Sequence, residues 1–450
     1  MNITKERIKT VLICILITGM LYLTYAVWFF DSPFGTIDIY GLFNSEKSTE
    51  FLVGEGSDLD VFGIRPMAVF IRDEEKSTGT VYETAISDEA YKKLREVTAR
   101  VFATVKSHQT VSEAEWETAL LGKGVFFDYF GDVPLGAIQL WLGSSNDTNE
   151  LSGRYFMLSA DKKNVEVFVK NSMSHEVYRL SCALSSQKLV EAVMETSAAP
   201  ASLALEMQED DFMSVWPETV IVSGRAKPVA ISSYNSHSAY GEDIKNTCLD
   251  CFRLRDVAPS TYSEADGTMV YVADMVTLKI SPDGTVSYSD TRDRTDSTLG
   301  IGIDYDGEAP TVAEKTEAAR ALVASVASRI PGDGGIYLMD VSEKADGTEI
   351  VFGRHVSGIP VDMQTTTYFA RVIVGNESIR AAKINVRGYE ATSQSVDVMS
   401  ERLAAAAVTG SGMKGNLMLR YADDGSASIV PAWYIGGMQK KEEADELVES

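Results

Sequence analysis

The chain is poor in the residues that build disulfide scaffolds and most metal sites. Its 450 residues include only four cysteines and four histidines. So few cysteines exclude a small disulfide-stabilised fold. The histidines are scattered, so the sequence nominates no general base: they are His108, His175, His237 and His355.

Positive charge is also scarce. There are 41 Lys and Arg against 65 Asp and Glu, which gives a formal net charge of −24. The first ten residues carry +2, so the remainder carries −26. That charge repels nucleic acid and anionic lipid head groups, and we expect no nucleic-acid partner. Hydrophobic residues make up 45% of the chain, enough for two or three folded domains.

One long apolar run stands out near the amino terminus. Val11–Phe30 contains twenty uncharged residues, a length that crosses a hydrocarbon core of about 30 Å as a helix. Lys5, Arg7 and Lys9 precede it, and an excess of basic residues predicts that this end stays in the cytoplasm. The rest of the chain is then extracytoplasmic, on a single-pass anchor in the cell membrane.

A cleaved signal peptide is the alternative. Thr24-Tyr25-Ala26 loosely resembles a cleavage site, but a cleavable signal usually has a shorter apolar region of about 7–15 residues. This run continues through Val27–Phe30 and ends in aromatic residues, which suit the membrane–water interface. The pattern favours a retained anchor.

The extracytoplasmic sequence mixes helical and strand patterns in its first part. We predict a helix capped by Ser87, with an apolar stripe that runs along it: Tyr91, Leu94, Val97 and Val101. Ser112–Glu115 is a capping box that opens a second helix, and a short helix is predicted near 187–195. Predicted strands cover 125–130, 137–142, 155–159 and 165–170.

The middle and last parts differ in regularity. Loops are predicted over 231–246, and strands at 269–272, 276–280 and 285–288. Thr311–Glu314 is another capping box, which opens an alanine-rich helix. Antiparallel strands, a helix near 395–408 and a closing hairpin follow it. The predicted fold class is therefore α+β, with helices packed on antiparallel sheets behind one transmembrane helix.

The predicted segments follow from these changes of pattern. They are a basic cytoplasmic start (1–10), the anchor (11–30), an α/β domain (36–200), a β-rich middle domain (201–305), an α+β carboxy-terminal domain (306–436) and an acidic tail (437–450).

Cys248-Leu249-Asp250-Cys251 matches the C-x-x-C pattern. A redox motif needs a thiol whose pKa is lowered, and the acidic residues nearby would raise that pKa instead. A zinc site needs two further ligands, and the sequence offers only a lone His237 nearby. A local disulfide or two free thiols are both compatible with the pattern.

Other catalytic motifs are incomplete. His175-Glu176 begins a zinc-protease pattern, but Arg179 stands where the second ligand belongs. Gly410–Gly415 satisfies G-x-G-x-x-G but follows a predicted helix and precedes a strand, the reverse of the dinucleotide-binding order. We therefore predict no catalytic, cofactor-binding or metal-binding residues, no cofactor and no enzymatic activity.

Four short segments carry a family resemblance: Gly124–Leu135, Asp283–Tyr288, Val356–Val361 and Pro431–Tyr434. In this order the chain resembles the YycH family of Gram-positive bacteria, with its YycI-related, PepSY-like carboxy-terminal region. Gly358, Pro360 and Trp433 are the family-like positions, with structural roles in a strand-edge turn and as a buried aromatic. The Cys248/Cys251 pair and the acidic tail depart from the family.

The resemblance implies a non-enzymatic regulator of a membrane sensor histidine kinase that controls cell-wall homeostasis. Its partners would be that kinase and a sibling regulator of the same type. The alternative function is an extracytoplasmic binding or inhibitory module that acts on a secreted hydrolase or an envelope-assembly factor.

One face of the predicted membrane helix carries small or hydrogen-bonding groups at helical spacing: Cys14, Thr18, Tyr22 and Tyr25. Such groups can pack against a partner helix in a bilayer. The other interpretation, that they face lipid and the interface, stays open.

Overall fold

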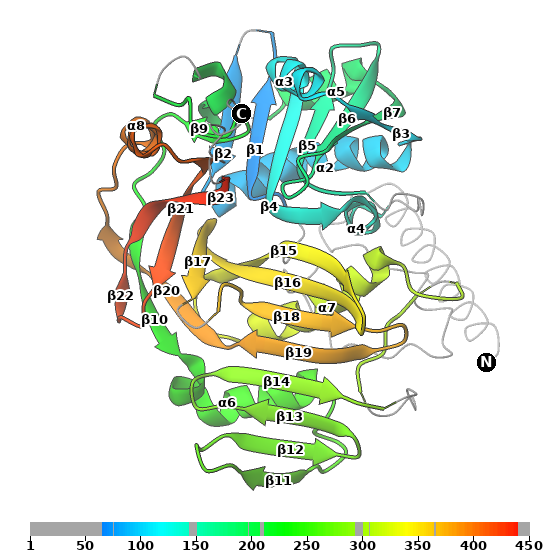
Figure 1. Ribbon diagram of the computed structural model, residues 1–450, viewed down its shortest axis with the longest axis vertical. Helices are drawn as coiled ribbons and strands as arrows, with labels where there is room; N and C mark the ends of the chain where they lie inside the picture. The colour runs from blue at the N-terminus through cyan, green and yellow to red at the C-terminus, as the bar shows by residue number, and fades with distance from the viewer. Residues whose placement is uncertain are drawn as a thin grey trace, which may run out of the picture. The chain divides into compact units, whose positions relative to one another are not determined.

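The structure is a computed structural model that describes residues 65–74, 76–143, 151–196, 198–207, 211–292, 300–305, 307–363 and 366–439. All of them belong to one compact unit, Asp58–Ser450. The fold is α+β, as predicted, with helices packed on mainly antiparallel sheets (Figure 1). The apolar segment Val11–Phe30 lies outside the described residues. Within the described part of the chain, no helix is long and apolar enough to span a membrane.

The first sheet has nine antiparallel strands in the order β3-β7-β6-β5-β4-β1-β2-β8-β9. Their bounds are β1 Ala68–Arg72, β2 Ser77–Val81, β3 His108–Val111, β4 Gly124–Pro134, β5 Ser152–Ser159, β6 Asn164–Lys170, β7 Val177–Ser185, β8 Ala199–Leu203 and β9 Val220–Val222. The strands predicted over 155–159 and 165–170 are confirmed, and they form the antiparallel pair β5–β6.

Helices cover both faces of this sheet. On one face, α2 (Thr84–Ala103) places Tyr91 against Phe127, and α5 (Ser186–Met194) packs beside α2. On the other face, α3 (Glu113–Leu121) places Trp116 against Phe126. The predicted stripe of α2 is buried throughout. The capping box Ser112–Glu115 is confirmed by both of its reciprocal hydrogen bonds.

The predicted cap of α2 is one turn too late. The helix begins at Thr84, and the Ser87 hydroxyl instead shares a 3.0 Å hydrogen bond with the hydroxyl of Thr80 on β2. The strand predicted over 137–142 is also wrong, because Leu135–Trp141 forms α4. A short apolar run does not distinguish a strand from a buried helix. Here a tertiary contact decides: α4 packs on α7 (Val312–Ala327), and Trp141 Nε1 donates to Glu317 at 2.7 Å.

The loops predicted over 231–246 are wrong as well. β10 (Val229–Asn235) is followed directly by α6 (Ser236–Cys251). The helix buries Ile244, Cys248 and Leu249, a stripe that is easily missed because one of its three members is a cysteine. In the sequence, polar residues around these three mask the helical period.

The last large sheet has eleven strands. Its order is β11-β12-β13-β14-β19-β18-β16-β17-β21-β23, and β15 pairs with β16 off this path. The bounds are β11 Ser260–Ser263, β12 Met269–Ala273, β13 Val276–Ile280, β14 Thr285–Asp290, β15 Gly334–Lys344, β16 Gly347–Val356, β17 Ile359–Met363, β18 Ala370–Val374, β19 Ile379–Asn385, β21 Lys414–Asp423 and β23 Pro431–Gln439. The pair β17–β21 is parallel, and the other pairs are antiparallel.

Two helices and a small sheet complete the carboxy-terminal part. α7 (Val312–Ala327) has the predicted capping box and packs against β15, β16 and β18. β20 (Arg387–Ser395) joins β10 and β22 (Ser428–Ile429) in a three-stranded sheet. The second helix, predicted near 395–408, is α8 (Glu401–Ser411), which is capped by Ser400.

Each large sheet contains strands from more than one of the predicted segments. β8 and β9, from the predicted middle domain and its border, complete the nine-stranded sheet, and β11–β14 extend the eleven-stranded sheet. The two large sheets meet where β4 lies along β15 (Figure 1). The predicted domain boundaries themselves stay a prediction.

The contact between the sheets contains a buried ion pair that can be tested. Arg154 donates to both carboxylate oxygens of Asp128, at 2.7 and 2.8 Å, and both side chains are under 10% exposed. Although burial alone would lower the pKa of Arg154, the adjacent Asp128 raises it above its ordinary value.

Asp128→Asn should lower the free energy of unfolding by about 3–5 kcal/mol, because it leaves the Arg154 charge buried and unpaired. Urea unfolding measures this. The matched control is Glu89→Gln in the exposed pair Glu89–Lys93, for which we expect a change below about 1 kcal/mol. Equal losses in the two variants would contradict the role assigned to the buried pair.

Candidate functional site

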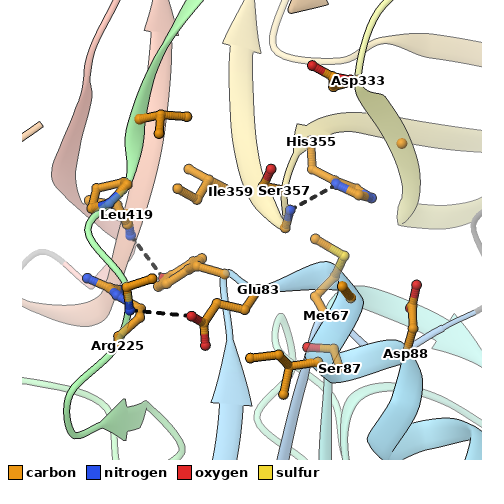
Figure 2. A pocket seen from close by; sticks show the side chains of 18 of the residues that line it. Met67, Glu83, Ser87, Asp88, Arg225, Asp333, His355, Ser357, Ile359 and Leu419 are labelled. Atoms are coloured by element: carbon orange, nitrogen blue, oxygen red, sulfur yellow. Dashed lines mark hydrogen bonds between the residues drawn. The ribbon is translucent and has the colours of Figure 1, made fainter. Parts of the chain in front are cut away.

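A cleft of about 800 Å³ opens where the two large sheets meet. Its walls come from the start of α2, the segment 225–229 before β10, the first residues of β15, the β16–β17 hairpin and β21. Figure 2 shows Met67, Glu83 and Ser87 on one side and His355 and Ile359 on the other. The volume lies in the usual range for ligand sites, about 300–1,000 Å³.

The β16–β17 hairpin forms one wall. Val356 pairs with Ile359, which leaves a two-residue loop of Ser357 and Gly358. Both loop residues have positive φ, 51° and 86°, as a type I′ turn requires. A Cβ atom on Gly358 would lie 3.1 Å from the Cα atom of Tyr82, so the loop is packed directly onto the start of α2. Pro360 follows in β17, opposite His355.

Tyr82 stands at the centre of the junction. Its hydroxyl accepts a 2.9 Å hydrogen bond from the backbone N–H of Leu419 on β21. Its ring lies 6.0 Å from that of Phe130 on β4 and 6.3 Å from that of Trp433 on β23. Burial raises the pKa of Tyr82 to about 12, so the hydroxyl stays protonated. One side chain thus joins the two large sheets.

Arg225 completes this cluster. Its guanidinium lies 5.2 Å from the ring centre of Tyr82 and 5.5 Å from that of Trp433, and it forms an ion pair with Glu401 at 3.1 Å. Trp433 is half-buried and donates from Nε1 to the Met399 carbonyl at 2.8 Å. A cation between two aromatic faces gains about 0.5–2 kcal/mol per ring.

Backbone strain is concentrated here. Among the described residues, seven other than glycine have positive φ, and three of them meet at this junction: Tyr82, Phe130 and Ser357. A left-handed conformation costs a residue with a Cβ atom roughly 1–2 kcal/mol. Such strain persists only where the surrounding structure enforces it, and it tends to cluster at clamps and switches.

His355 is a neutral side chain in the cleft wall. Its Nδ1 accepts a 3.2 Å hydrogen bond from the Gly358 N–H, which assigns the ring proton to Nε2. Burial, together with the charges of Arg354 and Arg65, lowers the pKa of His355 to about 3. The ring therefore supports the turn as a neutral acceptor.

Arg354 points to the opposite face of β16. It is 1% exposed, and within the described ranges its guanidinium nitrogens have no hydrogen-bond acceptor. The guanidinium lies 4.9 Å from the ring centre of Phe369, and burial lowers its pKa to about 10. A buried cation that is supported mainly by a ring face is a costly feature.

The rim of the cleft is charged but balanced. Its lining includes three basic side chains (Arg65, Arg225, Lys227) and three acidic ones (Glu83, Asp88, Asp333). The basic residues are all paired within the chain: Arg65 with Asp88, Arg225 with Glu401 and Lys227 with Asp397. The rim therefore has no net charge, in a protein whose formal net charge is −24.

The structure places some of the predicted positions and not others. Cys14, Thr18, Tyr22 and Tyr25 lie outside the described residues. Gly358 is in the cleft wall, Pro360 follows it in β17, and Trp433 is in the Tyr82 cluster. Sequence reasoning missed Tyr82 and Arg225, because neither carries a local motif.

The residues of the remaining motifs lie outside the lining of the cleft. Cys248 and Cys251 are free thiols in the last turn of α6, and burial raises the pKa of both. Arg179 forms an ion pair with Glu115 at 3.1 Å. Gly410–Gly415 connects α8 to β21, the predicted helix-to-strand order. In the part of the chain that the structure describes, no group of three or more His, Cys, Asp or Glu side chains is placed to hold a metal.

Three of the four segments that carry the family resemblance meet at Tyr82. Phe130 comes from 124–135, Gly358 from 356–361 and Trp433 from 431–434. The fourth, 283–288, lies elsewhere, and its Tyr288 stacks on Phe252 at 5.0 Å. Segments that are up to about three hundred residues apart in the sequence thus form one junction beside the cleft.

No protein-family model matches the chain, and no curated protein matches it. Among solved structures, the chain is similar to the crystal structure of YycH from Bacillus subtilis. The two share 14% sequence identity, the similarity covers 85% of this chain and 96% of that chain, and the TM-score is 0.49. Similarity at this level carries no argument about function, which rests on the residues of the chain itself.

Gly358→Ala should destabilise the protein more than a glycine change at an open left-handed position. The control is Gly412→Ala, where φ is 70° and a Cβ atom would meet nothing within 4 Å. Both variants bear the conformational cost of about 1–2 kcal/mol. The contact with Tyr82 should add about 1–3 kcal/mol for Gly358→Ala in urea unfolding. Indistinguishable losses would show that the turn is not tightly packed.

His355 should make stability depend on pH. Its pKa of about 3 in the folded state is below the unfolded value of about 6.5, so the unfolded state binds the proton first as pH falls. The contribution of the neutral His355 ring to the free energy of unfolding is complete above pH 6.5 and is lost progressively towards pH 3. Between pH 7 and pH 5 the free energy of unfolding should fall by about 2 kcal/mol more in the unchanged protein than in His355→Asn. The same pH slope in both proteins would refute this.

Proposed function

We propose that this protein is a membrane-anchored extracytoplasmic regulator that modulates a two-component sensor histidine kinase of cell-wall homeostasis. It acts by contact rather than by catalysis. Its membrane helix and its folded outer part both contribute to that contact.

The observation that carries the proposal is the convergence at Tyr82. Three of the four segments on which the family resemblance rests come from distant parts of the chain and build one strained junction. A regulator can shift a kinase only by binding its two states unequally. A strained junction between two sheets, beside an open cleft, is a place where the contacts with the two kinase states can differ.

The sequence supplies the membrane part of the proposal. Val11–Phe30 behind a basic start supports a retained anchor with the bulk of the chain outside the cell. Thr18 and Tyr22, with Cys14 and Tyr25, offer hydrogen-bonding groups on one face of that helix. We propose this face as the contact with the kinase helix.

The cleft favours a second candidate function. An open cleft of about 800 Å³ also suits a module that binds or inhibits a secreted hydrolase or an envelope-assembly factor. The two functions differ in their partner and in whether the membrane helix is needed.

Mild-detergent affinity purification of the full chain, read by mass spectrometry, tests the proposal. We expect a sensor kinase to be recovered with the full chain, and recovery to fall at least several-fold for a chain that lacks residues 1–30. Thr18→Leu with Tyr22→Leu should also weaken recovery, because the two changes remove the polar groups from the proposed contact face.

The matched control is Leu16→Val with Leu23→Val, on the opposite side of the same helix at 100° per residue. Recovery equal to that of the unchanged chain is expected for this control. Recovery of a secreted hydrolase by both the full and the truncated chain would instead establish the second function.

A further inference from the structure

The first residues of β15 present a strand edge to the cleft. β15 pairs with β16 and with no other strand in the described part of the chain. Gly334, Gly335 and Ile336 line the cleft. A strand edge carries unpaired backbone N–H and C=O groups, which another extended chain can join.

The same edge is covered further along. Gly131 of β4 lies against it, and a Cβ atom there would come within 2.3 Å of the Leu338 carbonyl oxygen and 2.5 Å of the Met339 Cα atom. β4 thus closes the middle of the edge, and only its beginning faces the cleft. This leaves room beside about three residues, or about 10 Å of strand.

We propose that the cleft binds an extended, uncharged stretch of a partner polypeptide, which pairs through its backbone with the edge of β15 at 334–336. This assignment rests on the proposed function, since it gives the outer part of the regulator a contact of its own. Pairing with a sheet edge supplies affinity through the main chain, and side-chain pockets supply specificity.

The charge of the cleft argues for an uncharged occupant. Its lining carries three basic and three acidic side chains, and each basic side chain already has an acidic partner within the chain. An anionic ligand would have to break one of these pairs, and a cationic ligand would compete with the backbone N–H groups of Ala226 and Ala391, which donate to Glu83 and Asp333. His355 adds no charge, because it is held neutral by the Gly358 N–H and by its burial.

The walls suit apolar side chains on an extended peptide. Met67 lies on one side of the cleft, and Ile359 and Leu419 lie on the other (Figure 2). Ile86, in the first turn of α2, also lines the cleft. Ile86 is 41% exposed, although it faces a concave surface. Residues of a bound strand alternate in direction, so every second side chain would reach one of these walls.

Selection of peptides on the full chain in detergent tests the proposal. The probe is a displayed pool of random heptapeptides without Asp, Glu, Lys or Arg, counter-selected on Ala85→Trp, which fills the mouth of the cleft at the first turn of α2. Ala226→Trp is a second blocking variant, in the segment before β10 that also lines the cleft. Ala103→Trp, at the exposed far end of α2, is the matched control.

The proposal expects heptapeptides that bind the native chain and Ala103→Trp equally and lose at least tenfold in affinity on both blocking variants. N-methylation of alternate amides in a selected peptide should abolish binding in one register and spare it in the other, because only every second amide faces the β15 edge.

Failure to enrich any peptide on the native chain over the blocked variants would overturn the proposal. Equal effects of N-methylation in both registers, or displacement of the peptide by inorganic phosphate, would overturn it too. Kinase recovery is read separately. Peptide binding without any kinase partner would support the cleft assignment and refute the proposed function, and kinase recovery without peptide binding would do the reverse.

Discussion

The junction between the two large sheets depends on the buried pair of Asp128 and Arg154. Asp128 accepts both guanidinium bonds and also a 2.7 Å hydrogen bond from the Phe130 N–H. The bond from the Phe130 N–H holds Phe130 at φ 64°, where the β4–β5 pairing is interrupted. A carboxylate that stabilises both a buried cation and a strained backbone turn leaves β4 little freedom to straighten.

The consequences of that turn reach the rest of the site. It presents the Phe130 ring to Tyr82 and to Tyr337, and it brings Gly131 against β15. Tyr82 in turn contacts Gly358 and Trp433 and accepts from Leu419. The cleft is thus the space that remains between the two sheets beside these contacts.

The elements with strong local signals follow from the sequence. Both capping boxes, at Ser112 and Thr311, are confirmed because the bonds they predict lie within one helical turn. The sequence does not predict α4, because a contact with a distant residue decides it, as the bond from Trp141 to Glu317 shows. It does not predict α6, because the buried stripe of that helix includes a cysteine among polar residues. The residues of the site are the hardest to predict, because they meet through contacts between distant parts of the sequence. Phe130, Arg225 and Trp433 meet Tyr82 across 48, 143 and 351 positions of sequence, and no local pattern records such contacts.

The two faces of β16 show how one strand serves the cleft. His355 faces it as a neutral acceptor, while Arg354 keeps a charge on the opposite face with a ring as its main support. Because burial lowers the pKa of His355 to about 3, the ring supports the turn as a neutral acceptor in the folded state. The shape of the cleft depends on how the two large sheets are placed relative to each other at Tyr82. Binding in the cleft and any contact that alters this junction are then coupled, and by linkage each changes the affinity for the other equally.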